Sequence, residues 1–521
     1  MRRASEKYLR VILMSVVAMC LCAGLATAQE GSYGGTLRVA VNNEVGSLDM
    51  ALDTTDLVSI IGIHIWETLF VYDAGGNPVP YLAEDLEYNE DGTIVTIHLR
   101  EGVLFHNGDE MDSGDVAISL ERAFEYGKRS NMIGAYVTDV ATPDKYTVVL
   151  TFSSPFGPLT SILAHFTGGS PIMPAEIAEA AGGNLLTTDQ YIGTGPYQFV
   201  EHIPGVHLKL RRFEEYVPVD QEPDGYAGRR IAYVDEILFI SVPESDTRYA
   251  GVEAGDYDYG YRMASSLYEL ATADPTLLVL KDSPPAWNMV ALGWKEGPLA
   301  DPLLRGAVKA ALDFTEITAL SLGSLGSPNP SIMVDTTPWY TLAGAEWYDK
   351  PDPEKAKDLM SQAGYDGEPL VFLSTASNDV RYLSSIAIVE QLTNVGFNVE
   401  LKLYDWPTVK SLRGDMGNWD LLIGSHGGYV EPAVQSFLNP AKQFAWDTPE
   451  ITALVAQLIS ETEYEARFAV WEQIQTLLYE DGVLIKLNDG YEWHVASATR
   501  LTGADKAPLR WLSFWNIWKN D

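Results

Sequence analysis

Polar and aromatic side chains follow three predicted strands in the second half of the chain. The residues with binding chemistry at these strand ends are Thr375, Asn378, Asp405, Trp406, His426, Tyr429 and Glu431. Hydroxyl, amide and carboxylate groups can hydrogen-bond a polar solute, and aromatic rings can stack on it. These residue types therefore indicate a binding site for a polar molecule.

The elements that must position these side chains are predicted over residues 349–432. Asp352 and Pro353 are typical of a helix start, and Gly364 is typical of its end. A second helix, ending at Gly396, lies between strands 370–373 and 397–403. Its predicted buried stripe consists of Leu383, Ile386, Val389 and Leu392.

The order strand–helix–strand–helix–strand predicts three parallel strands, the last one within 419–432. Ligands of open α/β sheets bind outside the carboxyl ends of the strands. Asn43 and Glu44, which end a predicted strand at 35–41, are further candidates. Trp287 and Asn288 are others, in a Pro-marked crossover at 282–292 that we interpret as a hinge.

The first half of the chain predicts a small β-rich unit. A hairpin turning at Asp91-Gly92, a helix over 113–125 and a strand over 144–152 all fall within residues 80–190. Further strands are predicted at 193–201 and 234–242, and a short helix at 246–254.

The N-terminus predicts a secretory signal peptide over residues 1–28, with a basic start, an apolar stretch from Val11 to Leu25 and a small-residue cleavage site. Cys20 and Cys22 both lie inside it, so the mature chain has no thiol for a disulfide or a metal. Met19 and Leu21 precede these cysteines and argue against a lipid anchor. The formal charge of −37 disfavours nucleic acid and anionic lipid as partners.

The motifs of several enzyme classes are absent from the sequence. There is no phosphate-binding glycine loop, dinucleotide fingerprint, His-Glu-x-x-His or nucleophile elbow, and the eight histidines are scattered. A secreted, acidic α/β chain of this kind favours a binding protein without metal or cofactor. A hydrolase would need an acid/base pair in the cleft, such as Asp405 with Glu431.

Several segments resemble the bacterial extracellular solute-binding proteins of family 5, which include peptide-binding and nickel-binding components of ABC importers. The most specific is Leu-Arg-Glu-Gly-Val-Leu-Phe-His-Asn-Gly at 99–108. The others are Gly-Thr-Gly-Pro-Tyr (193–197), 252–258, 352–365, 391–401 and 514–518. The resemblance covers nearly all of the mature chain.

The resemblance implies an α/β, bilobal periplasmic-binding-protein fold of cluster C type, with ligand enclosed between two lobes by hinge closure. Domain I would comprise 29–79, 190–285 and 490–521. Domain II, an extra β-rich subdomain, would span 80–189, and domain III, the opposing lobe, 286–489. The chain is then expected to be a periplasmic monomer that serves a membrane permease.

The charged groups that hold dipeptides in similar proteins do not map cleanly here. Gly428 stands where peptide-binding members carry an amine-binding Asp, and Thr375 falls at the position of a carboxylate-binding Arg. Glu431 could accept an amine instead, and Arg381 or Arg413 could receive a carboxylate. Two cargoes therefore remain open, namely a small peptide and an oligosaccharide stacked on Trp287, Trp406 or Tyr429.

Overall fold

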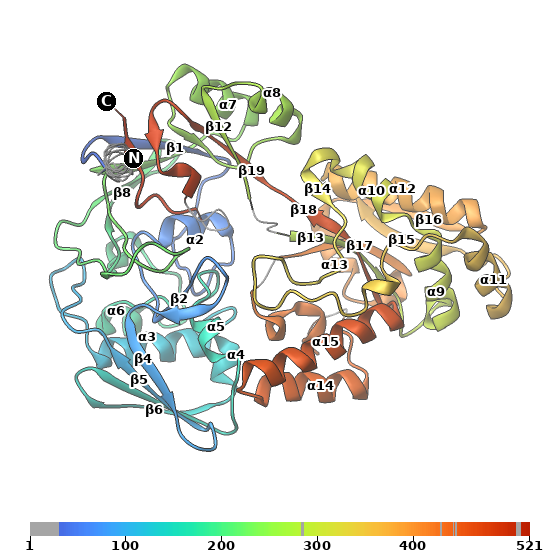
Figure 1. Ribbon diagram of the computed structural model, residues 1–521, viewed down its shortest axis with the longest axis horizontal. Helices are drawn as coiled ribbons and strands as arrows, with labels where there is room; N and C mark the ends of the chain where they lie inside the picture. The colour runs from blue at the N-terminus through green and yellow to red at the C-terminus, as the bar shows by residue number, and fades with distance from the viewer. Residues whose placement is uncertain are drawn as a thin grey trace, which may run out of the picture.

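The computed structural model describes residues 31–282, 286–427, 430–440, 442, 445–506 and 512–520. The predicted signal peptide, Gly428 and Tyr429 lie outside the described residues. The chain forms two lobes, each built around its own sheet (Figure 1). The predicted α/β bilobal fold is thereby confirmed.

One lobe contains a seven-stranded mixed sheet at its centre. Its strands, in spatial order, are β12 (Leu277–Lys281), β19 (Trp493–Ser497), β11 (Tyr259–Gly260), β1 (Thr36–Val41), β10 (Glu236–Ser241), β9 (His207–Arg212) and β8 (Tyr197–Ile203). Strand β1 is parallel to both neighbours, and the other pairs are antiparallel. The associated helices are α2 (Asp56–Gly62), α7 (Ser245–Ala254) and α8 (Tyr268–Thr272).

The same lobe carries the predicted β-rich unit, a four-stranded antiparallel sheet (Figure 1). Its order is β4 (Ala83–Tyr88), β5 (Ile94–Leu99), β7 (Thr147–Phe152) and β6 (Val137–Asp144). The helices are α3 (Ser113–Tyr126), α4 (Asn131–Gly134), α5 (Leu159–Leu163) and α6 (Ala175–Ala181), and β2 (Phe70–Tyr72) pairs with β3 (Pro78–Pro80). Asp112 caps α3 with a complete capping box.

The second lobe contains a six-stranded sheet in the order β14 (Gly326–Ser327), β18 (Leu484–Gly490), β13 (Ala286–Leu292), β17 (Leu421–Gly427), β15 (Leu370–Thr375) and β16 (Val399–Tyr404). Strand β15 is parallel to both β16 and β17, so the predicted parallel trio is confirmed. The helices are α9 (Pro302–Ala311), α10 (Phe314–Ser321), α11 (Pro353–Ala363), α12 (Asp379–Val395), α13 (Trp406–Leu412), α14 (Pro449–Ser460) and α15 (Tyr464–Asp481).

The predicted buried stripe of α12 is wrong for two of its four residues. Leu383 and Ile386 are 40% and 41% exposed, whereas Ser384, Ser385 and Ile388 are buried. The Ser385 hydroxyl bonds both the Ser374 hydroxyl (2.7 Å) and the carbonyl of Arg381 (2.8 Å). Because its hydrogen bonds are satisfied, a small polar residue can face β15, which a purely hydrophobic pattern cannot anticipate.

The chain passes twice between the two large sheets. It leaves β12 for β13 and returns from β18 to β19, and the two passages are joined by a 2.8 Å bond from the Asp282 amide to the Glu492 carbonyl. The segment 282–292 is predicted as a crossover. Its described part is mostly β13, a central strand of the second sheet. The exact domain limits stay a prediction.

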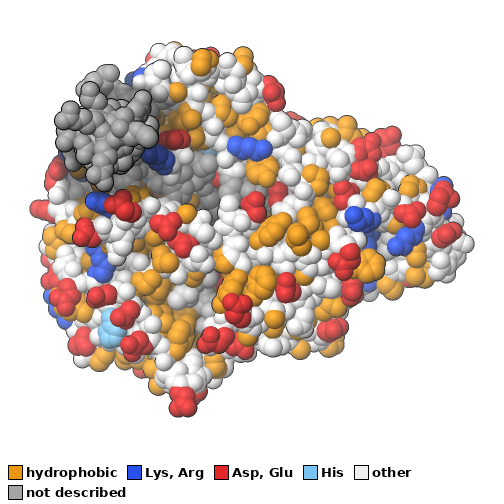
Figure 2. Space-filling model, in the orientation of Figure 1, with side chains coloured by type: hydrophobic (Ala, Val, Ile, Leu, Met, Phe, Trp, Pro, Cys, Tyr) orange, Lys and Arg blue, Asp and Glu red, His pale blue; other side chains and the backbone are white. Residues whose placement is uncertain are grey.

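Acidic side chains are scattered over both lobes on the face shown in Figure 2, with no dense acidic cluster. No helix among the described residues is long and apolar enough to cross a membrane.

Candidate ligand-binding cleft

A cavity of about 1040 Å³ lies between segments that belong to the two lobes. One wall comes from Leu52–Thr54 and from the α3–α4 region, and the other from β17 and the segments that follow it. The polar residues of the lining are Asp53, Thr54, Lys128, Arg129, Asn131, Tyr136, Arg413, Ser425, His426, Ser436, Asn439 and Lys442. A volume of this size suits a ligand of several residues or sugar rings.

The first wall is fixed by a buried ion pair between Asp49 and Arg122, at 2.6 Å from Oδ2 to Nη2. The second carboxylate oxygen of Asp49 accepts hydrogen bonds from the amides of Ala51 and Leu52. The Lys128 amide donates to the Ala51 carbonyl at 2.9 Å. These contacts tie the 49–54 loop to the end of α3 and place Lys128 at the cavity.

The second wall includes the carboxyl end of β17, where His426 is buried. Its ring stacks on Trp287 with centroids 4.7 Å apart, and Nδ1 lies 2.9 Å from the Ser436 hydroxyl. Burial, together with the charge of Arg413, lowers the pKa of His426 to about 3. The imidazole is therefore neutral at physiological pH and acts as a rigid polar surface.

Two arginines meet beside this strand end. The Arg381 guanidinium lies 3.9 Å above the Trp406 ring centroid and donates to the Ser425 hydroxyl at 3.0 Å. Burial and then the nearby charge of Arg413 lower the pKa of Arg381. Arg413 and Ser425 line the cavity themselves. Two partly buried cations at one strand edge repel each other, so an anion placed between them gains from both.

Three predicted binding residues on this edge have structural roles. Asn378 caps α12 by accepting from the Arg381 amide (3.0 Å), and Asp405 caps α13 by accepting from the Thr408 amide (2.7 Å). That hydrogen bond lowers the pKa of Asp405. Thr375 is buried and bonds Ser377. None of the three lines the cavity.

Replacement of Asn378 by alanine is expected to lower the free energy of unfolding by about 1 kcal/mol, because α12 loses its N-cap. Ligand affinity should change less than threefold, since the side chain faces its own helix. Urea denaturation and calorimetric titration of the same variant measure the two effects. A tenfold loss of affinity at unchanged stability would show that Asn378 contacts the ligand.

Glu431 requires a correction. Its side chain is 1% exposed, and its carboxylate forms a two-point ion pair with Arg467, at 2.5 and 3.3 Å. It also accepts from the Ala433 amide at 3.1 Å. Because every oxygen already has a buried partner, this carboxylate is poorly placed to accept a peptide amine.

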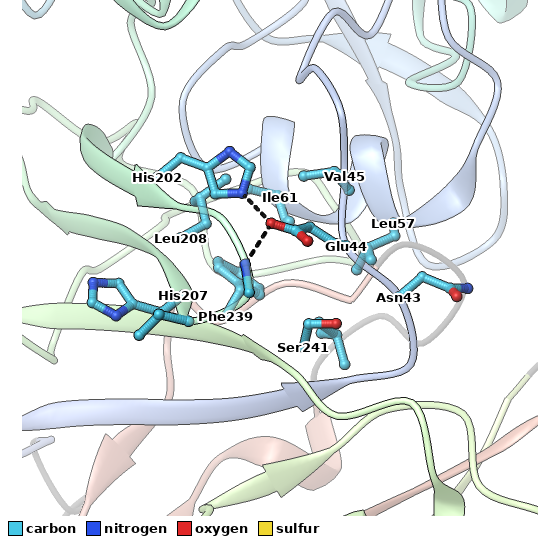
Figure 3. A pocket seen from close by; sticks show the side chains of 13 residues that line it. Asn43, Glu44, Val45, Leu57, Ile61, His202, His207, Leu208, Phe239 and Ser241 are labelled. Carbon is cyan, nitrogen blue, oxygen red and sulfur yellow. Dashed lines mark hydrogen bonds and ion pairs between the residues drawn. The ribbon is translucent and has the colours of Figure 1, made fainter.

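Asn43 and Glu44 border a different cavity of about 20 Å³, enough for one water molecule (Figure 3). Glu44 accepts from His202 Nε2 at 3.1 Å and from the Gly205 amide at 3.0 Å. Glu44 therefore supports the 202–205 turn, and neither Asn43 nor Glu44 lines the large cavity.

The remaining two candidates lie within β13. Trp287 is fully buried, and Asn288 donates to the Asn488 side chain at 2.8 Å across the strand pair. Of the sequence candidates that the structure describes, His426 and Arg413 line the large cavity directly, and Trp406 contacts Arg381 beside it. Sequence reasoning missed Lys128, Arg129 and Lys442, whose short Gly-Lys-Arg and Ala-Lys surroundings carry no strand-end signal.

Among the residues that the structure describes, no group of three or more His, Cys, Asp or Glu side chains could hold a metal ion.

A family model and a relative with a similar sequence both belong to solute-binding proteins. The model of the family "Bacterial extracellular solute-binding proteins, family 5 Middle" matches residues 77–447. The "Probable peptide ABC transporter periplasmic-binding protein y4tO" of Sinorhizobium fredii is 27% identical over 498 residues, which cover 91% of this chain and 92% of that protein.

Two solved structures share the fold. DppA of Helicobacter pylori, in complex with the peptide STSA, has a TM-score of 0.75 at 19% identity and covers 95% of this chain and 100% of its own. AppA of Bacillus subtilis, in complex with a nonapeptide, has a TM-score of 0.74 at 19% identity, with 94% and 100% covered. Because the family match spans well over half of its residues, this chain belongs to the bacterial extracellular solute-binding proteins of family 5.

Proposed function

We propose that this chain captures a small peptide between its lobes and delivers it to the permease of an ABC importer. The relatives described above bind peptides or carry peptide-transport names. The observation that carries the proposal is the guanidinium of Arg413 in the cavity lining beside β17, with the charge of Arg381 close to it, because a free peptide carboxylate at Arg413 would be attracted by both. Guanidinium forks bind carboxylates with two parallel hydrogen bonds.

An oligosaccharide is supported less well. Sugars require aromatic faces in the cleft, but Trp287 is buried against His426 and one face of Trp406 is covered by Arg381. Neither indole is in the described cavity lining.

The two residues predicted as an acid/base pair for hydrolysis have structural partners instead. Asp405 caps a helix and Glu431 is held by Arg467. We therefore propose a carrier without catalytic activity, as is typical of solute-binding proteins.

We further propose that the protein acts in the periplasm as a monomer. The predicted signal peptide supports export to the periplasm, and a monomer would present both lobes to the permease. Domains I, II and III with the limits predicted above would close on the peptide by rotation about the paired passages at Asp282 and Glu492.

The test is a thermal-shift screen of the purified protein against short peptides and, in parallel, against oligosaccharides. A peptide at one hundred times its dissociation constant should stabilise the protein by about 2.7 kcal/mol. Stabilisation by oligosaccharides alone would contradict the peptide proposal, and turnover of any compound would contradict the carrier proposal.

A further inference from the structure

The two lobes also meet away from the paired passages, in the lower part of the view in Figure 1, where α14 lies next to α4. Here the loop between β7 and α5 carries Gly157. Its amide donates to the Ile459 carbonyl, in the last turn of α14, at 2.8 Å. Ile459 also lines the large cavity. A backbone hydrogen bond thus joins the two lobes beside the candidate ligand site.

Gly157 fits against the second lobe only because it has no side chain. A Cβ atom at this position would overlap the carbonyl oxygen of Glu461 and would lie 2.9 Å from Cδ of Arg467. Glycine is the residue that allows such a close approach of two backbones. The Glu461 carbonyl belongs to the main chain, so it cannot rotate aside as a side chain could. Even a methyl group would therefore hold the two lobes apart.

Two further close approaches join the lobes. At the turn between β4 and β5, a Cβ atom on Gly92 would lie 3.5 Å from Cγ2 of Thr462. In the loop between β2 and β3, a Cβ atom on Gly76 would lie 2.8 Å from the Thr336 carbonyl oxygen. Three loops of the first lobe thus meet the second lobe at short range, and two of them meet it at residues 459–463, which connect α14 to α15.

This connection is joined to the wall of the cavity through a buried ion pair. Arg467 Nε donates to the Leu458 carbonyl at 3.0 Å, and its guanidinium contacts the Glu431 carboxylate at 2.5 and 3.3 Å. Glu431 in turn caps the short helical turn Pro432–Val434, which contributes Ala433 and Val434 to the cavity lining. The surface that receives Gly157 is therefore held in a fixed position relative to the ligand site.

We infer that Gly157 and residues 459–463 form a latch that holds the lobes closed around the ligand. The inference rests on the proposed function, in which the lobes close by rotation about the paired passages. Rotation away from the closed arrangement breaks the hydrogen bond from Gly157 to Ile459. The latch therefore raises the population of the closed form, and the apparent affinity for the ligand rises with that population.

Hydrogen exchange of the unmodified protein tests the latch, because the Gly157 amide is bonded across the cleft only while the lobes are closed. After removal of any bound compound, a fragment containing residues 153–159 is followed by mass spectrometry, without and with a saturating peptide from the thermal-shift screen. We expect the Gly157 amide to exchange at least tenfold more slowly with the peptide. A fragment containing β5, whose hydrogen bonds lie inside the first lobe, is the control and should not change.

Peptide binding that leaves the exchange of Gly157 unchanged would overturn the latch and leave the proposed function intact. If no peptide binds in the screen, the proposed function fails. The same measurement with the compound that does bind then decides the latch separately.

The variant Gly157→Ala places a methyl group in the latch, and Gly46→Ala is its matched control, since a Cβ atom at Gly46 has no heavy atom within 4 Å. Calorimetric titration should show at least a tenfold loss of affinity in Gly157→Ala and less than a twofold change in the control. The urea midpoint of both ligand-free variants should stay unchanged, because open lobes accommodate the methyl group. Unchanged affinity in Gly157→Ala, or a lower urea midpoint without ligand, would contradict a contact made only on closure.

Discussion

Replacing Glu431 by alanine is expected to lower the free energy of unfolding by about 3–5 kcal/mol, because the change leaves the buried guanidinium of Arg467 without its counter-charge. Arg467 is 4% exposed, donates to the Leu458 carbonyl at 3.0 Å and lies 4.8 Å from the Trp339 ring centroid. It cannot move to solvent without breaking these contacts, so the lost ion pair is not replaced by water.

Urea denaturation followed by tryptophan fluorescence measures this loss. The double variant Glu431→Ala with Arg467→Met removes both charges and should recover part of the stability, since no unpaired ion remains. Surface pairs such as Lys357–Glu354 provide a matched control, and their removal should cost less than about 1 kcal/mol. An alanine variant of normal stability that no longer binds peptide would show that Glu431 contacts the ligand after all.

Replacing Arg413 by methionine should weaken peptide binding by about 2–5 kcal/mol, the range for truncating one partner of a buried, hydrogen-bonded charge pair. Methionine preserves much of the side-chain length, so packing beside His426 and α13 should be retained. The loss corresponds to roughly 30-fold or more in the dissociation constant. Calorimetric titration with a peptide identified in the thermal-shift screen gives this value.

The control for this prediction is the same peptide with an amidated C-terminus. It lacks the terminal carboxylate, so it should bind weakly and nearly equally to the protein and to Arg413→Met. Arg381→Lys is a second comparison, because lysine keeps the charge but loses the planar fork and the stacking on Trp406. An Arg413→Met variant that discriminates between acid and amide as the unmodified protein does would exclude this arginine as the carboxylate partner.

Local patterns predicted much of the second lobe correctly. Asp352, Pro353 and Gly364 mark the ends of α11 where expected, and the helix–strand alternation gave the parallel trio β17, β15 and β16. The helix ends depend on residues within a few positions of one another, and the parallel trio follows from the order of helices and strands along the chain. They are therefore readable from the sequence without knowledge of tertiary contacts.

The site was less predictable because its residues meet over long separations in the chain. Glu431 looked free for a ligand, but its partner Arg467 lies 36 residues away on α15. Lys128 and Arg413 come from different lobes, and only the folded chain brings them to one cavity. Strand-end reasoning placed the candidates at the carboxyl edge of the parallel strands, yet Asn378 and Asp405 serve there as helix caps.

The most direct measurement is the identity of the compound that the protein carries when it is purified without refolding. The protein is denatured, the released small molecules are separated, and their masses and fragmentation patterns are determined. We predict a short peptide with a free terminal carboxylate. Release of an oligosaccharide, with no peptide bound in either the purified protein or the thermal-shift screen, would contradict the account.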